Sequence, residues 1–425
     1  MMGNVKSRPH LVIIGWFVWA FICLIIMASG VAWLAGWIRV NVSLPLRYAC
    51  GLLQIILGVL AAYYGALKFF WYVVKWLSRG KTKNGNSTGR GPKIVVIGGG
   101  TGLGTILRGL KEVSSNITAI VTVADDGGSS GRLRREFGIL PPGDIRNCLV
   151  AMADLEPLME KLMQYRFDGD SVFAGHNFGN LFLTALINVT GDFEKAIKES
   201  SKVLAVRGRV LPATLEHVTL NAEFADGTVI RGESAIPLAG RPITRVFLEP
   251  KNIKPVAESI IAIKEADVIL LGPGSLYTSV IPNLLVADIA DAIRSSNAAK
   301  VYVCNAMTQP GETEGYSASQ HIQAIINHAG TGLIDYAVVN TGDIPARILG
   351  RYAEEGSQPV EADLERIKAL GINPIAMDII KKTSVIRHDA LKLAELILEL
   401  ARRRKIENVF GKGIMGQLYR LFKGF

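Results

Sequence analysis

Two long uncharged runs open the chain. Residues 11–38 contain no charged side chain, and residues 48–67 form a second uncharged run that ends in Lys68 and several aromatic residues. Each run reaches the ~20 apolar residues that are needed to cross the hydrocarbon core of a bilayer. The pattern predicts a transmembrane helical hairpin over residues 1–77, with helices at about residues 11–38 and 48–70.

Basic residues around these runs predict the orientation of the hairpin. The short loop between the runs carries Arg39 and Arg47, whereas six basic residues follow the second run, from Lys75 to Lys93. Because basic residues are retained on the cytoplasmic side, we expect a multi-pass protein of the inner cell membrane, with both termini and the remaining chain in the cytoplasm. The alternatives are a cleavable signal peptide, whose apolar core is only ~7–15 residues long, and buried helices of a large globular protein.

Short apolar segments alternate with helical patterns after a flexible basic tether at residues 78–92. The predicted strands, each followed by Gly, Asn, Ser or Asp, are residues 94–97, 117–124, 267–271, 300–305 and 336–340. Residues 203–250 instead alternate apolar and polar positions around the turn signal Asp226-Gly227, which predicts an antiparallel β-insertion. We therefore expect residues 93–391 to form an α/β domain with a doubly wound, mostly parallel, Rossmann-like sheet whose strand ends line one crevice.

A glycine-rich loop joins the first predicted strand to a helix. Residues 98–104 read GGGTGLG. The main-chain N–H groups of such a loop can approach a ligand closely, and the start of the following helix favours phosphate. The glycine spacing matches neither the dinucleotide pattern G-x-G-x-x-G nor an ATPase loop with Gly-Lys-Ser/Thr. The loop predicts a phosphate or pyrophosphate site, and the alternative is a tight turn into an ordinary helix.

An acidic loop follows the second predicted strand. It reads DDGGSSGR from Asp125, and it should adjoin the glycine loop because the ends of neighbouring parallel strands lie side by side. Carboxylates at this position could hold a metal ion or accept hydrogen bonds from sugar hydroxyls, and Asp125 is the candidate metal ligand. The alternative is a solvated turn followed by a basic helix.

Composition and charge restrict the kinds of partner that the protein is expected to bind. The net charge is +10, and much of it lies beside the apolar runs and in residues 392–425, which we expect to form a C-terminal amphipathic basic tail. Such a tail suits an anionic membrane surface or docks on the domain. The sequence contains no nucleic-acid-binding module. Its four cysteines are widely spaced, which argues against a disulfide framework and fits a reducing compartment.

Six ordered motifs in the predicted domain carry a resemblance to a known family. They are GGGTGLGTILRGLK from Gly98, VTVADDGGSSGRLR from Val121, PPGDIRNCL from Pro141, GHNFGNLFLTAL from Gly175, LGPGSLYTSVIPNLL from Leu271 and CNAMTQPGETEGY from Cys304. Together they resemble the gluconeogenesis factor family, the YvcK group of the CofD-like (2-phospho-L-lactate transferase) superfamily, over about residues 93–391. The chain departs from the pattern at Gly104, where a small hydroxyl residue is common, and in its hairpin, which soluble members lack.

The resemblance implies a regulatory protein that binds a UDP-sugar, typically UDP-N-acetylglucosamine, and links carbon metabolism to cell-wall precursor synthesis and cell shape. No catalytic activity is established for the group. The matching positions for recognition of the nucleotide sugar are Tyr352, whose ring suits uracil, and Arg387, whose guanidinium suits pyrophosphate. The expected binding residues are Gly99, Gly100, Thr101, Gly102, Asn177, Asn180, Gly274, Ser275, Asn305, Tyr352 and Arg387.

An alternative function from the same superfamily is a Mg²⁺-dependent transferase of the 2-phospho-L-lactate transferase type that acts on a nucleotide-linked substrate. Asp125 and Asp126 would then be the catalytic candidates, whereas a regulator needs no catalytic residue. We expect that no cofactor is required, and we leave open whether Mg²⁺ binds. The expected partners are the UDP-sugar, the membrane and proteins of cell-wall synthesis or its regulation, without nucleic acid, and a homo-oligomer is left open.

Overall fold

The computed structural model describes residues 9–35, 37, 43–78, 91–286, 288–382 and 386–410. It divides into two compact units, Met1–Gly85 and Asn86–Phe425. The boundary falls within the stretch that the sequence predicts as a tether, and each unit is described by itself below.

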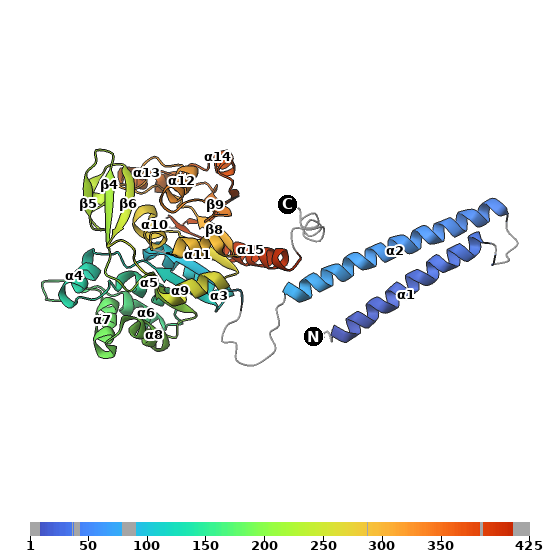
Figure 1. Ribbon diagram of the computed structural model, residues 1–425, viewed down its shortest axis with the longest axis horizontal. Helices are drawn as coiled ribbons and strands as arrows, with labels where there is room; N and C mark the ends of the chain where they lie inside the picture. Colours follow the sequence, from blue (N-terminus) through green and yellow to red (C-terminus); the bar gives the residue numbers. More distant parts are fainter. Residues whose placement is uncertain are drawn as a thin grey trace. The chain divides into compact units, whose positions relative to one another are not determined.

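The first unit consists of two long helices, α1 (Pro9–Leu34) and α2 (Leu44–Ser78), which run antiparallel to each other (Figure 1). Glycines let the two backbones approach closely, because a Cβ atom on Gly58 would lie 2.5 Å from Cγ of Met27. Helix α2 begins earlier than predicted, so that Arg47 lies in its first turns and not in the loop. The Nε atom of Arg47 donates to the carbonyl of Trp33 at 2.8 Å, which satisfies a main-chain acceptor at the end of α1.

The outer surface of this helix pair is apolar. Large side chains on both helices are exposed, among them Phe21 and Leu24 of α1 and Leu57 and Leu60 of α2. Within the described residues, one continuous helix, Leu44–Ala66, is long and apolar enough to cross a membrane, whereas the apolar segment of α1, Val18–Leu34, is shorter. The two predicted helices are therefore present, and one of them has the length and composition of a membrane span.

The second unit is built on a seven-stranded sheet in the order β10-β9-β8-β7-β1-β2-β3, in which all neighbouring strands are parallel. Its strands are β1 (Ile94–Gly98), β2 (Ile117–Val121), β3 (Arg209–Pro212), β7 (Val268–Leu271), β8 (Ala299–Val303), β9 (Tyr336–Asn340) and β10 (Asn373–Met377). This confirms the predicted doubly wound, mostly parallel α/β fold. The central strands β1, β2, β7 and β8 are buried along their whole length, as a sheet covered on both faces requires.

The predicted antiparallel insertion is also present, with narrower bounds. It contains β4 (Thr219–Phe224), β5 (Val229–Arg231) and β6 (Ile243–Glu249) in the order β5-β4-β6. Strand β3 lies within the range predicted for the insertion, but it pairs with β2 and extends the main sheet. Near the C-terminus, β11 (Ile380–Lys382) and β12 (Ile386–His388) form a separate antiparallel pair.

Helices cover both faces of the main sheet (Figure 1). One core packs α3 (Gly100–Val113), α5 (Gly143–Met152), α8 (Phe193–Val203) and α15 (Ala390–Phe410) on one face. The other core packs α9 (Ala257–Glu265), α10 (Ile281–Leu284), α11 (Ile289–Ser295), α12 (Ala318–Ala329), α14 (Leu364–Ala369) and the insertion. The remaining helices are α4 (Gly128–Phe137), α6 (Pro157–Gln164), α7 (Phe178–Thr190), α13 (Ala346–Glu354), η1 (Pro237–Ala239) and η2 (Leu276–Val280).

The order of the strands identifies the place where a ligand is expected. From β1 the chain moves outward through β2 to β3, and it then returns to β7 on the other side of β1. The strand order therefore reverses between β1 and β7. In open α/β sheets, ligands bind in the crevice outside the carboxyl ends of the strands at such a switch point.

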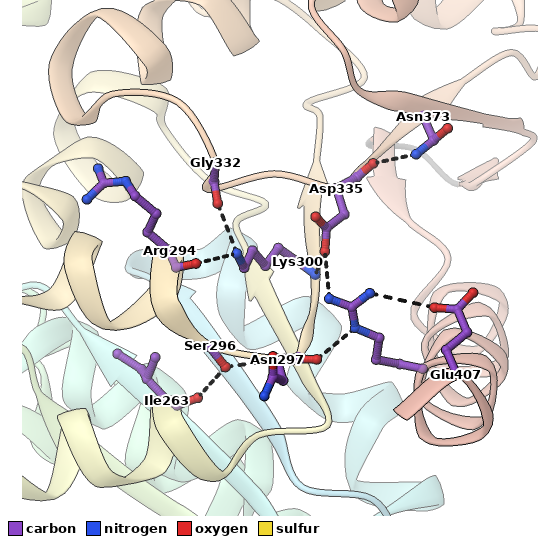
Figure 2. A network of polar contacts seen from close by, with 11 residues as sticks. Ile263, Arg294, Ser296, Asn297, Lys300, Gly332, Asp335, Asn373 and Glu407 are labelled. Atoms are coloured by element: carbon purple, nitrogen blue, oxygen red, sulfur yellow. Dashed lines mark hydrogen bonds and ion pairs between the residues drawn. The ribbon is translucent and has the colours of Figure 1, made fainter. Parts of the chain in front are cut away.

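The C-terminal helix is part of this unit. Leu393, Ile397 and Leu400 of α15 are buried in the core. Residues 392–410, which we expected to be the first part of a tail, therefore belong to a helix that docks on the domain. Figure 2 shows polar contacts between its later turns and the segments before β8 and β9, with Asn297, Asp335 and Glu407 labelled. The Nε atom of Arg404 on α15 donates to the carbonyl of Asn297 at 2.7 Å, whereas its ion pair with Glu407, at 3.6 Å, lies within the helix.

Candidate functional site

The glycine loop lies at the switch point, together with two other loops. A Cβ atom on Gly102 would lie 2.8 Å from the carbonyl of Pro273, so the loop after β1 touches the loop after β7. The main-chain N–H of Gly274 donates to Oδ1 of Asn305 at 3.3 Å, and Nδ2 of Asn305 donates to the carbonyl of Gly274 at 2.9 Å. The structure thus brings together the predicted residues of three strand ends. Thr101 lies in the first turn of α3, and its side chain is outside the described part of the chain.

A buried carboxylate lies behind the loop after β7. Ser275 donates from Oγ to Oε1 of Gln309 at 2.8 Å, and Gln309 donates to Glu312 at 2.8 Å. Glu312, which is 2% exposed, also accepts from the hydroxyl of Thr278 at 3.0 Å. Burial raises the pKa of Glu312 to about 7. The predicted residue Ser275 is therefore joined to the interior by a hydrogen-bonded chain that the sequence motifs did not reveal.

The start of helix α3, where the sequence predicts a phosphate, is next to a carboxylate of the protein itself. The N–H of Gly100 donates to Asp144, which lies in the first turn of α5. A Cβ atom on Gly99 would lie 2.5 Å from Oδ2 of Asp144, so only glycine fits at this position of the loop. The anion that faces the first turn of α3 in this structure is thus Asp144.

Asp144 belongs to a group of three mutually interacting carboxylates, with Asp125 after β2 and Glu233 of the insertion. Burial, and after it the charge of Asp125, raises the pKa of Asp144 to about 7. Burial, and then Asp125 and Asp144, raises the pKa of Glu233 to about 8. Burial also raises the pKa of Asp125, whose Oδ1 accepts from the N–H of Gly127 at 2.9 Å. The predicted acidic loop does adjoin the glycine loop, and the crevice is acidic there.

The second aspartate of the acidic loop holds the insertion in place. Oδ1 of Asp126 accepts from the main-chain N–H of Ser234 at 2.9 Å. Among the described residues, no group of three or more His, Cys, Asp or Glu side chains is arranged to hold a metal ion. Mg²⁺ at Asp125 therefore stays a prediction.

Asn177 and Asn180 form hydrogen bonds within the protein. Oδ1 of Asn177 accepts from the N–H of Asn180 at 3.2 Å and so caps helix α7. The main-chain N–H of Asn177 and Nδ2 of Asn180 both donate to Oγ of Ser129 at 3.2 Å. Both asparagines are buried, and these contacts join α7 to the start of α4. Their predicted contact with a ligand stays a prediction.

Tyr352 and Arg387, which are distant in sequence, lie close together. Tyr352 is on α13, and its hydroxyl accepts from the main-chain N–H of Ile386, the residue before Arg387, at 3.1 Å. The guanidinium of Arg351 lies 5.9 Å from the centre of the Tyr352 ring. Arg387 on β12 is directly opposite Lys381 on β11, and both side chains are exposed. Sequence reasoning missed Lys381, because the pairing register of two short strands is not visible in the sequence.

Strand β12 connects this aromatic and basic group to the crevice. Nε2 of His388, next to Arg387, donates to the carbonyl of Cys304 at 3.1 Å, and Cys304 precedes the predicted site residue Asn305. The main chain after Tyr352 also packs on the loop after β8, where the N–H of Gln358 donates to Oγ1 of Thr308 at 2.9 Å. The candidate site therefore has a basic and aromatic part at β12 and an acidic part at Asp144.

These features define a Rossmann-like α/β protein with a ligand crevice at the switch point of its sheet. The model of the family described as 2-phospho-L-lactate transferase CofD matches residues 94–380. The chain is 56% identical over 315 residues to a putative gluconeogenesis factor of Thermoanaerobacterium thermosulfurigenes. The alignment covers 73% of this chain and 97% of that protein. It is 54% identical over 315 residues to the gluconeogenesis factor of Bacillus subtilis, covering 74% of this chain and 99% of that one.

The chain therefore belongs to the CofD family, among its gluconeogenesis factors. A crystal structure of a protein from Bacillus halodurans has the same fold, with a TM-score of 0.71 and 52% sequence identity, covering 73% of this chain and 99% of that one. Because that protein corresponds over almost its whole length to the α/β unit, a unit of this kind folds without the hairpin.

Proposed function

We propose that this protein is a regulatory gluconeogenesis factor that binds a UDP-sugar, with UDP-N-acetylglucosamine as the expected ligand. By this proposal it links carbon metabolism to cell-wall precursor synthesis and cell shape. The observation that carries the proposal is the group of Tyr352, Arg387 and Lys381. Like charges directly opposite on neighbouring strands are destabilising, so Lys381 and Arg387 favour an anion between them. The diphosphate of a UDP-sugar supplies this anion, and the Tyr352 ring offers a flat face to uracil.

The acidic part of the crevice suits the sugar better than the phosphates. An anion bound beside Asp125, Asp144 and Glu233 would oppose their ionisation, whereas carboxyl groups whose pKa values are raised to about 7 (Asp144) and about 8 (Glu233) can exchange hydrogen bonds with sugar hydroxyls. In the proposed binding mode, uridine and diphosphate lie at β12, and the sugar extends along the strand ends toward Asp144.

We further propose that residues 1–77 anchor this domain to the inner membrane as a two-helix hairpin with both termini in the cytoplasm. The exposed apolar side chains of α1 and α2 support this, since a soluble monomer rarely exposes so large an apolar surface. The basic residues after α2 support the orientation. Proteins of cell-wall synthesis or its regulation are the proposed partners, and self-association is part of the same hypothesis.

Isothermal titration calorimetry with UDP-N-acetylglucosamine tests the binding proposal on the unit Asn86–Phe425. Arg387→Ala removes a charge-assisted hydrogen bond of ~1.5–3 kcal/mol, so the dissociation constant should rise roughly tenfold to 150-fold. Tyr352→Ala should weaken binding less than Arg387→Ala but more than Tyr352→Phe, because phenylalanine keeps the ring. Lys381→Ala should weaken binding several-fold. Lys368→Ala is the control, since this exposed lysine pairs with Glu365 on its own helix.

Two further experiments distinguish the proposed regulator from the alternative transferase. Titrations with and without Mg²⁺, repeated with Asp125→Asn and Asp126→Asn, show whether either carboxylate acts through a metal ion. Absence of binding by the unchanged unit at millimolar UDP-N-acetylglucosamine, or unaltered affinity in both the Arg387→Ala and Tyr352→Ala variants, would refute the proposed site. Product analysis with nucleotide-linked substrates would then test the transferase alternative.

A further inference from the structure

Strand β3 is an open edge of the main sheet. It pairs with β2 on one side, and no other described strand pairs with its outer side. The N–H of Ala213 donates to the carbonyl of Val121 at 2.8 Å. Because main-chain groups point alternately to the two sides of a strand, Val210 directs its N–H and C=O outward. Pro212, the next outward-facing residue, has no N–H and its carbonyl accepts from Oγ of Ser259 at 3.5 Å, so the main-chain groups that can pair with a further strand are those of Val210.

A groove of about 760 Å³ runs along this edge. Residues 208–212 line it on the side of β3, α8 forms one wall, and Glu258 of α9 lies on the other side. The helices α8 and α9 cover opposite faces of the sheet, so the groove is open in the direction in which another strand would add. Its position along an unpaired strand fits an extended peptide beside β3.

The wall formed by α8 is basic. Lys195, Lys198 and Lys202 are three or four residues apart, so they lie on one face of the helix, and Arg209 of β3 adds a fourth basic residue to the lining. The acidic residues of the lining are Glu194 and Glu258. Lys202 is paired with Glu199 at 2.7 Å, which leaves Lys195 and Lys198 as the exposed cations that dominate the α8 wall.

We propose that this edge binds an extended acidic segment of a partner protein, which adds to the sheet as a strand beside β3. Side chains of an added strand alternate between the two faces. Acidic side chains therefore face Lys195 and Lys198 on α8, and apolar side chains face the α9 side, where Glu258 disfavours further acidic residues. A second copy of this chain fits less well, because antiparallel pairing of two β3 strands around a two-fold axis places both basic α8 faces on the same side.

Fluorescence anisotropy on the unit Asn86–Phe425 tests the proposal with a labelled peptide, Glu-Val-Glu-Val-Glu-Val-Glu, acetylated and amidated at its ends. A peptide with proline in place of the central valine keeps the charge but cannot complete the strand. A peptide with lysine in place of each glutamate reverses the charge. Both control peptides should bind at least about tenfold more weakly, since each lacks one of the two sources of recognition.

Charge reversal on the protein provides the matched comparison. The double variant Lys195→Glu/Lys198→Glu should weaken binding of the acidic peptide about tenfold. The variant Lys161→Glu/Lys368→Glu carries the same change in net charge on α6 and α14, and it should bind as the unchanged protein does. Hydrogen exchange should show that the peptide protects the N–H of Val210.

Four results would overturn the proposal. Equal binding of the proline peptide, or binding without protection of Val210, would mean association by charge alone. An unaltered affinity of the Lys195→Glu/Lys198→Glu variant would exclude the basic wall as the recognition element. Protection of Val210 that rises with protein concentration in the absence of peptide would identify a second copy of the chain as the occupant. None of these measurements depends on UDP-sugar binding.

Discussion

Replacing Asp144 by asparagine should make the protein more stable at alkaline pH. The Asp144 carboxylate is close to the carboxylates of Asp125 and Glu233, and burial withdraws it from water. Asparagine has nearly the same shape, and its Oδ1 can still accept the N–H of Gly100. The substitution therefore removes the charge and keeps the hydrogen bond at the start of α3.

The magnitude and its pH dependence follow from the pKa of Asp144. This pKa is raised from 3.8 to about 7, so the folded state binds the proton more tightly than the unfolded state. The stability that the protonated group contributes is fully present below pH 3.8 and is lost as the pH rises through about 7. At about 1.4 kcal/mol per pKa unit, the whole shift corresponds to about 4 kcal/mol. Because Asp125 and Glu233 share this interaction, we expect a gain of about 1–2 kcal/mol at pH 8 and a smaller gain at pH 5.

Urea unfolding of the unit Asn86–Phe425 at pH 5 and pH 8 measures this gain. Circular dichroism is the suitable signal, because all six tryptophans lie before residue 77. Asp144→Ala, which also removes the acceptor for Gly100, should lose about 1–3 kcal/mol relative to Asp144→Asn. Asp154→Asn, which breaks an exposed ion pair with Arg207, should change stability by less than about 1 kcal/mol. An Asp144→Asn variant that is equally destabilised at both pH values would refute the reasoning and identify Asp144 as an ordinary helix-capping anion.

The remaining predictions concern the amino ends of the strands, the hairpin and the choice of ligand. Lys300 is 7% exposed, and its Nζ donates to the carbonyls of Arg294 and Gly332 (Figure 2). Lys300→Met should therefore lower the free energy of unfolding by about 2–4 kcal/mol, whereas Lys93→Met, which breaks an exposed ion pair, should lower it by less than about 1 kcal/mol. A reporter enzyme fused after Gly91 should be active only on the cytoplasmic side, and activity confined to the outer side would refute the proposed topology. UDP-glucuronate should bind at least about tenfold more weakly than UDP-N-acetylglucosamine, because Asp144 and its neighbours repel a second carboxylate; equal affinities by calorimetry would place the sugar elsewhere.

Sequence patterns predicted the centre of the fold better than its edges. Strands β1, β2, β7, β8 and β9 are mostly apolar, which is typical of strands covered on both faces. The edge strands β3 and β10 were missed. Both contain proline (Pro212 and Pro374), and neither is buried along its whole length. Edge strands commonly have these properties because one side lacks a partner.

The same limit applies to the candidate site. Parallel strands place their carboxyl ends at one edge, so the proximity of Gly102, Gly274 and Asn305 could be predicted from strand order alone. The position of Asp144 could not, because it depends on how α5 packs against α3. Nor could the pairing of Lys381 with Arg387, which depends on the register of β11 and β12. Contacts between elements that are distant in sequence are set by packing, and a single sequence does not record them.

The basic and aromatic part of the candidate site and its acidic part together restrict the chemical class of the ligand more than either part does alone. At one end of the candidate site, Arg351 lies beside the ring of Tyr352 and Lys381 lies opposite Arg387. Asp125, Asp144 and Glu233 form its acidic part. A free sugar phosphate lacks an aromatic base for Tyr352, and a dinucleotide would place a second phosphate or base in the acidic part. A nucleoside diphosphate joined to a neutral sugar has its charge in the middle, an aromatic base at one end and hydroxyls at the other. That order of groups matches the proposed binding mode, and this is the physical reason why we propose a UDP-sugar rather than another phosphate ligand.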